Sequence, residues 1–461
     1  MNTDNTSLLL GIDVGTTSIS FQIVSAQSGK CVESFSIVHN AGDENKKDGS
    51  FAQNALLLSE KTLSAVDDLL VKYENITSIG VTGQMHGIIC INSNNEIVSP
   101  LYTWQNEFGT KRTPDGLTVC EEIEKKCGIY IPTGYGITTY YALRYFGILP
   151  EETSLICTIP DYIAASLCRS RPVCHATNAA SLGLFDIENN DFDVDALNKL
   201  GIPRSVLPKI AKDYEIAGYY SKNGRKIPVV SAIGDNQSSV LGSLADENSI
   251  LVNVGTGSQI CYISDKRNSE VGEVRPYFDG KYLISGAALC GGRAYSLLKD
   301  LVDSILYSFG WSAAESDIYY FLNRSAKCAE NTDLAADTRF CGTRENPFEK
   351  GNFTNVCSEN FKIGDMAAAI LKGIVEELFD MYQKMQIGEG KKIIVSGNAM
   401  RKNRILREFC SKRFVQKVFV PEQKEEAAFG AALYAGISTG IISREKLSDI
   451  IKYISDEEEI R

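Results

Sequence analysis

The sequence contains two similar segments, each an apolar run that ends in a Gly-Thr turn. The first is Leu8–Ser18, in which Asp13 lies near the end of the run and Gly15-Thr16-Thr17 follows. The second is Ser249–Ser258, which contains Gly255-Thr256-Gly257. Each pattern predicts a buried strand that turns tightly into another strand. Two such turns far apart in one chain predict two similar halves that hold one polyphosphate.

The first turn has the chemistry of a phosphate clamp beside a metal ligand. Gly15 allows a positive φ and a close approach of the backbone to a ligand. The hydroxyls of Thr16 and Thr17 and the nearby backbone N–H groups can bind phosphate oxygens. The carboxylate of Asp13 suits Mg²⁺, directly or through water. A plain hairpin whose aspartate caps the turn explains this segment alone equally well. The second segment is what favours the clamp.

Composition limits the partners and the compartment. A formal charge of −11 on 461 residues argues against nucleic acid or an anionic membrane as main partner, because either requires a basic surface. The thirteen cysteines form no Cys-x-x-Cys pair and no zinc pattern, so we expect reduced thiols. The first apolar run is too short for a signal peptide and follows no basic region. These features predict a cytoplasmic location.

The order of the predicted elements indicates an α/β fold. Three strands within residues 8–38 precede a helix over 53–73 and a further strand, which is how a ribonuclease-H-like unit begins. The pattern loosens around 88–226, where we expect an insertion that builds a pocket rather than sheet. The strand and turn pattern is then repeated in the second half. The predicted domains are 1–243 and 244–461.

Asp235 is the best candidate for a general base. It follows a predicted strand over 227–233 and precedes a predicted helix over 238–244, which would direct its carboxylate into a cleft between the domains. An ionised aspartate at hydrogen-bonding distance orients a sugar hydroxyl and takes its proton during phosphoryl transfer. Asp235 can equally be a helix N-cap, and the two roles are compatible.

Other candidates carry weaker signals. Gly397-Asn398 follows an apolar strand and could accept a flat adenine ring, although glycine is common in such turns. The small-residue helix containing Ala427–Ala432 could pack close to that turn, although such a helix more often indicates only tight packing. His86 follows a strand end between two glycines and should face the cleft, or be a structural histidine. Trp104 could stack on a sugar whose hydroxyls bond to Gln105-Asn106, or could belong to the core.

In combination, these motifs resemble the FGGY family of carbohydrate kinases. The resemblance spans nearly the whole chain and rests on the order of Leu10–Ser18, Gly83–Gly87, Gly234–Gln237, Asn253–Gly257 and Gly397-Asn398. Further segments are most similar to the sedoheptulose kinases of this family: Thr103–Gln105, Thr158–Tyr162, Asn178–Ser181, Gly286–Leu289 and Gly291-Gly292.

The resemblance implies two actin-like domains that close on MgATP and a ketose and pass phosphate to the terminal hydroxyl of the sugar. It implies that Asp235 is the base and that Asp13 is the metal-side carboxylate. The sugar would lie in the N-terminal domain, against Gln84, Met85, His86, Trp104 and Asn178. The nucleotide would lie in the C-terminal domain, against Gly255, Thr256, Gly257, Gly397 and Asn398.

One departure affects the choice of sugar. The sedoheptulose kinases have an aspartate and then an arginine shortly after Trp-Gln, whereas this chain has Asn106-Glu107-Phe108. The resemblance as a whole leads us to expect sedoheptulose. Because of this departure, xylulose or ribulose is the alternative. A non-catalytic nucleotide or sugar sensor on the same fold is the alternative of another class. Whether the protein forms a homodimer stays open.

Overall fold

The computed structural model describes residues 7–42, 49–222, 224–267, 272–343, 346, 348–388 and 390–455. The chain forms two compact α/β units. The first unit comprises Met1–Ala245, Arg275–Gly280 and Gln423–Ile451. The second comprises Asp246–Val274, Lys281–Glu422 and Lys452–Arg461. A single cut in the sequence does not separate the units, because two later segments return to the first.

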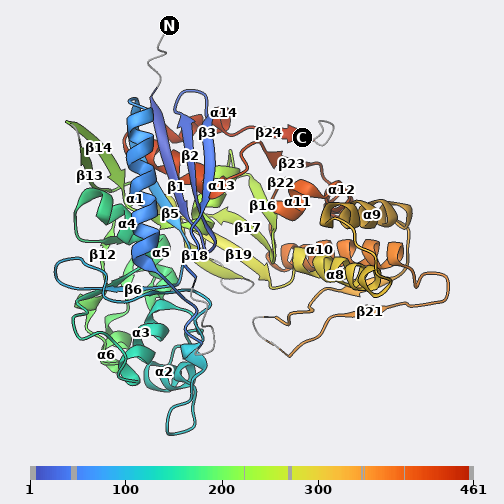
Figure 1. Ribbon diagram of the computed structural model, residues 1–461, viewed down its shortest axis with the longest axis horizontal. Coiled ribbons are helices and arrows are strands. Elements are labelled where there is room, and N and C mark those ends of the chain that lie inside the picture. The colour runs from blue at the N-terminus through green and yellow to red at the C-terminus, as the bar shows by residue number, and fades with distance from the viewer. Residues whose placement is uncertain are drawn as a thin grey trace. The chain divides into compact units, whose positions relative to one another are not determined.

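A mixed sheet forms the centre of the first unit (Figure 1). Its strand order is β13-β14-β5-β1-β2-β3, and β15 also pairs with β5. β1 is antiparallel to β2 and parallel to β5, and it is apolar on both faces because both are covered. The strands are β1 (Leu8–Val14), β2 (Ser18–Ser25), β3 (Cys31–Val38), β5 (Ile76–Gly83), β13 (Ile216–Lys222), β14 (Arg225–Val230) and β15 (Ile233–Gly234).

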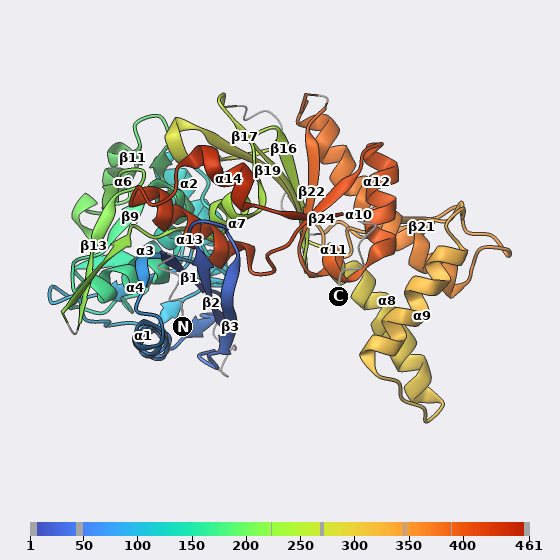
Figure 2. The same cartoon turned by 90° about the horizontal axis from the view of Figure 1, so that it is seen from above.

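Helices cover both faces of this sheet. α1 and α4 lie on one face and α13 lies on the other (Figure 2). α1 begins after Asn54, whose side chain accepts a hydrogen bond from the N–H of Leu57 as an N-cap. The four helices nearest the sheet are α1 (Ala55–Lys72), α4 (Ile159–Cys168), α7 (Asp235–Ser243) and α13 (Glu426–Ser438).

α13 packs backbone to backbone against the sheet and α7. A Cβ atom added at Gly11 of β1 would lie 1.8 Å from a carbonyl oxygen of α13, and one added at Gly80 of β5 would lie 1.9 Å from another. Gly242 of α7 meets the same helix, at 2.2 Å. At these contacts the backbones approach closely, which explains why small residues are frequent in α13. The structure confirms tight packing as the interpretation of this helix, which belongs to the first unit and not to the unit that contains the Gly397 turn.

Much of the expected insertion forms a helical layer with its own apolar core. Its helices are α2 (Val119–Cys127), α3 (Gly136–Tyr145), α5 (Ala176–Leu182) and α6 (Val194–Lys199). Short strand pairs join it: β4 (Ala52–Gln53) with β7 (Leu101–Tyr102), β6 (Ile89–Ile91) with β8 (Leu155–Cys157), β9 (Val173–His175) with β12 (Lys209–Ala211), and β10 (Phe185–Asp186) with β11 (Asp191–Phe192). The last part of the stretch differs from expectation, since β13 is an edge strand of the main sheet.

The second unit repeats the strand arrangement of the first. Its order is β18-β19-β17-β16-β22-β23-β24, with β16 antiparallel to β17 and parallel to β22. The strands are β16 (Ser249–Val254), β17 (Ser258–Ser264), β18 (Glu273–Pro276), β19 (Tyr282–Ala288), β22 (Lys392–Ser396), β23 (Val418–Pro421) and β24 (Tyr453–Ser455). Two sheets with the same order and the same antiparallel-then-parallel pairing are the actin-like arrangement.

A layer of helices packs on the sheet of the second unit, with α10 in contact with β17, β19, α9 and α12. The helices are α8 (Gly292–Ser308), α9 (Glu315–Cys328), α10 (Ile363–Lys384), α11 (Asn398–Lys402) and α12 (Arg404–Phe414), and β20 (Ala335–Asp337) pairs with β21 (Asn352–Thr354). Among the described residues, none of the helices combines the length and hydropathy that a membrane span requires.

Candidate active site

Two carboxyl groups interact in the first unit, near the ends of strands that share one neighbour. Asp13 is the next-to-last residue of β1, and Asp235 directly follows β15; both strands pair with β5. Both aspartates are partly buried. Desolvation, followed by the negative charges of Asp235 and Glu425, raises the pKa of Asp13 to about 7. Negative charge is therefore concentrated at this point of the unit.

Asp235 has the properties of a base that works near neutral pH. Desolvation raises its pKa to about 6, against the opposing effects of the Arg275 guanidinium and of the backbone N–H groups of Asn236 and Asp235 itself. A carboxyl with this pKa is ionised at pH 7 and is more basic than an ordinary aspartate. Asp235 is the first residue of α7, and the N-cap of that helix is Gly234, which has no side chain to cap it.

The donor chemistry around Asp13 fits a magnesium ion. Desolvation and then the repulsion from Asp235 and Glu425 raise the pKa of Asp13, a divalent cation would offset both, and carboxylate oxygen is a ligand that Mg²⁺ prefers. In the described part of the chain, no three or more His, Cys, Asp or Glu side chains are grouped as metal ligands. Mg²⁺ usually retains water and binds substrate phosphates, so one or two carboxylates suffice.

The Gly15-Thr16-Thr17 turn is held from two sides. The N–H of Gly15 donates to the carbonyl of Ser18 at 3.0 Å, which closes the turn. The amide of Gln53 donates to the carbonyl of Thr16 at 2.7 Å, and the indole N–H of Trp104 donates to the Thr16 hydroxyl at 3.1 Å. Trp104 is 49% exposed and is therefore not a core residue. The structure thus brings this residue and the predicted phosphate turn together.

Gln84 belongs to the same network. Its side-chain N–H donates to Gln53 Oε1 at 2.9 Å, while its backbone N–H donates to the carbonyl of Val14 at 2.9 Å. The side-chain oxygen of Gln84 is buried and has no hydrogen-bond partner among the described residues. Gln53 was missed in the sequence because it lies at the start of an ordinary helical pattern. It fixes the amide of Gln84 so that the oxygen remains available as an acceptor.

Met85 and His86 follow Gln84 along the loop after β5. The sulfur of Met85 would lie 2.9 Å from a Cβ added at Gly234, so Met85 packs beside the residue that precedes Asp235. His86 has a φ of 71°, and its Nδ1 lies 2.9 Å from the carbonyl of Ser181, which identifies Nδ1 as a donor. Its ring also stacks at a tilt on Tyr135, with centroids 4.3 Å apart.

Asn178 resembles Gln84 in how its amide is held. Its N–H groups donate to Asp161 Oδ1 at 3.1 Å and to the carbonyl of Ala232 at 3.4 Å. Its oxygen is buried and, within the described ranges, without a hydrogen-bond partner. Desolvation raises the pKa of Asp161 to about 6, although Thr158, Cys174 and Asn178 all donate to it. In the sequence, Asp161 belongs to a segment that resembles the sedoheptulose kinases, but the resemblance assigns it no role.

The two residues after Trp104 differ in their surroundings. Asn106 is fully buried; its N–H donates to the carbonyl of Ser50 at 2.8 Å, and its oxygen accepts from the N–H of Phe108 at 3.0 Å. Gln105 is exposed. The amide of Asn106 is thus occupied in holding the loop, whereas Gln105 faces solvent.

In the second unit, the Gly255-Thr256-Gly257 turn packs on the start of α8. The N–H of Gly292 donates to the carbonyl of Gly255 at 2.9 Å, and the N–H of Gly291 donates to the carbonyl of Thr256 at 3.0 Å. A Cβ added at Gly291 would lie 2.3 Å from the carbonyl oxygen of Gly257. The Gly-Gly pair is therefore required for this close contact.

The Gly397 turn lies next to it, at the end of a parallel strand. β16 and β22 are paired, and the side chain of Asn253 donates to the Ser396 hydroxyl at 2.8 Å. Gly397 has a φ of 87°, and a Cβ there would lie 2.5 Å from the carbonyl oxygen of Val254. Asn398 is the first residue of α11. The structure therefore brings these predicted nucleotide residues to one edge of the second sheet.

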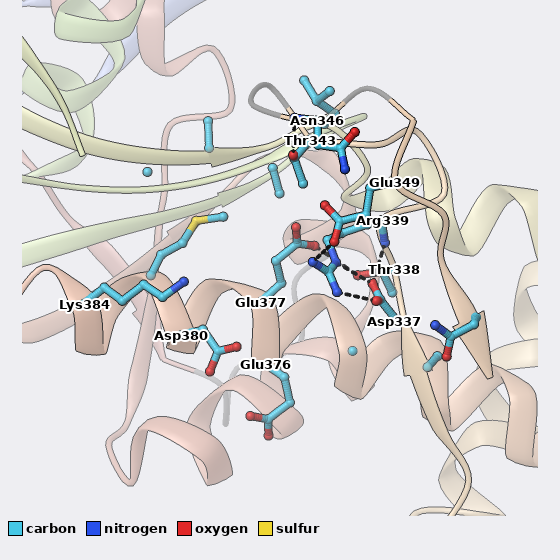
Figure 3. Close-up of a pocket in the computed structure, with 18 of the residues that line it drawn as sticks. Asp337, Thr338, Arg339, Thr343, Asn346, Glu349, Glu376, Glu377, Asp380 and Lys384 are labelled. Carbon is cyan, nitrogen blue, oxygen red and sulfur yellow. Dashed lines mark hydrogen bonds and ion pairs between the residues drawn. The ribbon is translucent and has the colours of Figure 1, made fainter. Parts of the chain in front are cut away.

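A solvent-open hollow of about 1140 Å³ lies in the second unit, between α10, β19 and the β20–β21 region (Figure 3). Its charged lining residues are Glu273, Asp337, Arg339, Glu349, Glu376, Glu377, Asp380 and Lys384. Arg339 is already paired with Asp337 and Glu349, and carboxylates outnumber cations. The acidic lining of this hollow disfavours phosphate.

Comparison with known proteins agrees with this arrangement. The N-terminal domain of the FGGY family of carbohydrate kinases matches residues 8–242, and its C-terminal domain matches residues 251–439. The sedoheptulokinases of Mus musculus and Homo sapiens are each 27% identical over 92% of this chain and 96% of their own length. The ligand-bound xylulose kinase from Lactobacillus acidophilus superposes with a TM-score of 0.81 at 20% identity, covering 97% of this chain and 93% of that one.

The two domain matches together span most of the sequence, with the N-terminal match before the C-terminal match. The superposition shows the same fold for the full pair of units. The chain therefore belongs to the FGGY family of carbohydrate kinases and is a sugar kinase.

Proposed function

We propose that this enzyme transfers the γ-phosphate of ATP to the terminal hydroxyl of a ketose, with sedoheptulose as the first candidate. The observation that carries the proposal is the placement of Asp13 and Asp235 near the ends of two strands that both pair with β5, where burial raises their pKa values to about 7 and about 6. One suits a metal ion and the other suits a base.

Asp235 acts on the sugar. Its carboxylate accepts a hydrogen bond from the terminal hydroxyl, orients it, and takes its proton as the bond to phosphorus forms. Arg275 keeps this carboxylate ionised at neutral pH, since its positive charge opposes the effect of desolvation. Asp13 would hold Mg²⁺, and when bound the ion would neutralise charge on the phosphates.

The two glycine turns bind the nucleotide phosphates, Gly15–Thr17 from the first unit and Gly255–Gly257 from the second. Gly397 and Asn398 bind the adenine side. The positive φ of Gly397 and its tight contact with Val254 require glycine there, and a residue without a side chain lets a flat ring approach the backbone.

The sugar is recognised by amide oxygens. Gln84 and Asn178 each have buried oxygens without a protein partner among the described residues, and sugar hydroxyls are donors that would satisfy them. Trp104 offers an exposed ring for the carbon chain, and Gln105 is exposed beside it. Met85 and His86 complete this group. Asn106, by contrast, supports the loop.

Sedoheptulose is favoured because the two mammalian sedoheptulokinases match almost the full length of the chain. Xylulose or ribulose is the alternative, since a xylulose kinase shares the fold and the loop after Trp104 departs from the sedoheptulose pattern.

The test is a sugar panel. The purified protein is supplied with ATP and Mg²⁺ and with sedoheptulose, xylulose or ribulose, and ADP formation is measured against a sugar-free control. The proposal predicts sugar-dependent ADP with the highest kcat/KM for sedoheptulose. A higher kcat/KM for a pentulose would reassign the substrate. Binding of nucleotide and sugar without any ADP would instead identify a sensor and contradict the kinase proposal.

A further inference from the structure

A chain of hydrogen bonds starts at the residue before Asp235. The N–H of Gly234 donates to the hydroxyl oxygen of Thr177 at 3.0 Å. That oxygen lies 2.9 Å from Nδ1 of His175, and Nε2 of His175 lies 2.9 Å from Oδ1 of Asp213. His175 and Thr177 are fully buried. None of these three side chains was singled out as functional in the sequence.

The direction of each bond can be assigned. The backbone N–H of Thr177 donates to Nδ1 of His175 at 3.2 Å, so Nδ1 carries no proton and the ring proton is on Nε2. Nε2–H therefore donates to Asp213. The hydroxyl of Thr177 donates to Nδ1, while its oxygen accepts from Gly234. Each donor in this hydrogen-bond network has one acceptor. The network therefore favours a single arrangement of the Thr177, His175 and Asp213 side chains.

The other end of the chain reaches the segment that carries Arg275. Oδ2 of Asp213 accepts a hydrogen bond from the N–H of Asp279 at 2.7 Å. The His175 ring packs against Phe278 of the same segment, with centroids 5.7 Å apart. Arg275 is the cation that opposes the raised pKa of Asp235. The turn that carries Asp235 and the segment that carries Arg275 are thus both linked to His175.

We propose that His175, acting with Thr177 and Asp213, is a positioning residue for Asp235. It holds the turn between β15 and α7 and the Arg275–Gly280 segment in one frame, which fixes the carboxylate relative to the sugar hydroxyl. This inference rests on the proposed role of Asp235 as the base. A displacement of about 1 Å in a reacting group can cost on the order of 100-fold in rate, so loss of the frame should lower turnover more than binding.

The experiment compares two substitutions at Thr177. Thr177→Val keeps the shape but removes the hydroxyl, whereas Thr177→Ser keeps the hydroxyl and is the matched control. We expect Thr177→Val to lower kcat by about 10- to 100-fold with KM values for ATP and sugar within about twofold of wild type. Thr177→Ser should retain most of kcat. A folded Thr177→Val enzyme with kcat within about twofold of wild type would overturn the inference, as would equal impairment of both variants.

A second variant serves if Thr177→Val does not fold. Asp213 is one-third exposed in its side chain, so Asp213→Asn is tolerated more easily. The single side-chain oxygen of asparagine can replace only one of the two carboxylate oxygens. In the wild type, one of these accepts from His175 and the other accepts from the N–H of Asp279. The expected result is again a lower kcat at nearly constant KM, and an unchanged kcat would contradict the inference. Asp235→Asn is measured in parallel. If that variant is inactive while the Thr177 and Asp213 variants are normal, only the positioning role fails.

Discussion

The indole N–H of Trp104 donates a hydrogen bond to the hydroxyl of Thr16 at 3.1 Å. This bond joins the loop that carries the proposed sugar residues to the turn that carries the proposed phosphate residues. Because half of the Trp104 side chain is exposed, a ligand bound on either side of the bond would change the surroundings of the ring.

Trp104 should therefore report ligand binding by its fluorescence. The chain has two tryptophans, and Trp311→Phe leaves Trp104 as the single emitter. We expect the emission of this variant to change on titration with sugar or MgADP, and Trp104→Phe to show no such change. Loss of the bond in Trp104→Phe should also raise KM by about two- to tenfold, as for one neutral hydrogen bond. Unchanged emission of Trp311→Phe at saturating ligand would contradict the placement of Trp104.

Gly11→Ala should destabilise the first unit strongly. The new Cβ would lie 1.8 Å from a backbone oxygen of α13, and neither the strand nor the helix backbone can move aside cheaply. We expect a loss of at least about 2 kcal/mol in the free energy of unfolding, measured by denaturant titration. Gly42→Ala is the control, since a Cβ there meets nothing within 4 Å. Equal stability of the two variants would be incompatible with the backbone contact described for α13.

Asp161 should make stability depend on pH. Desolvation raises its pKa from 3.8 to about 6 in the folded protein, so the folded state binds a proton that the unfolded state lacks between these values. This group therefore adds stability as the pH falls through 6 and loses it as the pH rises. Relative to Asp161→Asn, the wild type should gain about 2 kcal/mol between pH 6.5 and pH 4.5. A difference that does not change with pH would mean that the carboxyl has an ordinary pKa.

The repeated strand and turn was the feature that sequence alone predicted best. One apolar run followed by Gly-Thr is compatible with a plain hairpin, but its repetition is not explained by one, and the actin-like arrangement of β1 with β2 and of β16 with β17 confirms the predicted duplication. The small-residue helix indicated tight packing but not its partners, because these are glycines at 11, 80 and 242, which are distant in sequence and carry no pattern of their own.

The surroundings of the predicted site residues were harder to foresee. Gln53, His175 and Arg275 interact with residues that are distant in the sequence, and a lone residue of these types has no local signature. Asn106 looked like a sugar ligand because amides bind hydroxyls. Its burial and its two loop hydrogen bonds depend on where residues 50 and 108 lie, which the local pattern does not contain.

The most direct test of the account is the sugar-dependent rate of ADP formation by Asp235→Asn, compared with wild type under the same ATP, Mg²⁺ and ketose concentrations. Asparagine keeps the size of the side chain but cannot accept the proton of the sugar hydroxyl. We predict that kcat falls by at least about 10²-fold while MgADP binding, measured by calorimetry, stays within about threefold of wild type. Turnover within about threefold of wild type would contradict the assignment of Asp235 as the base and, with it, the proposed mechanism.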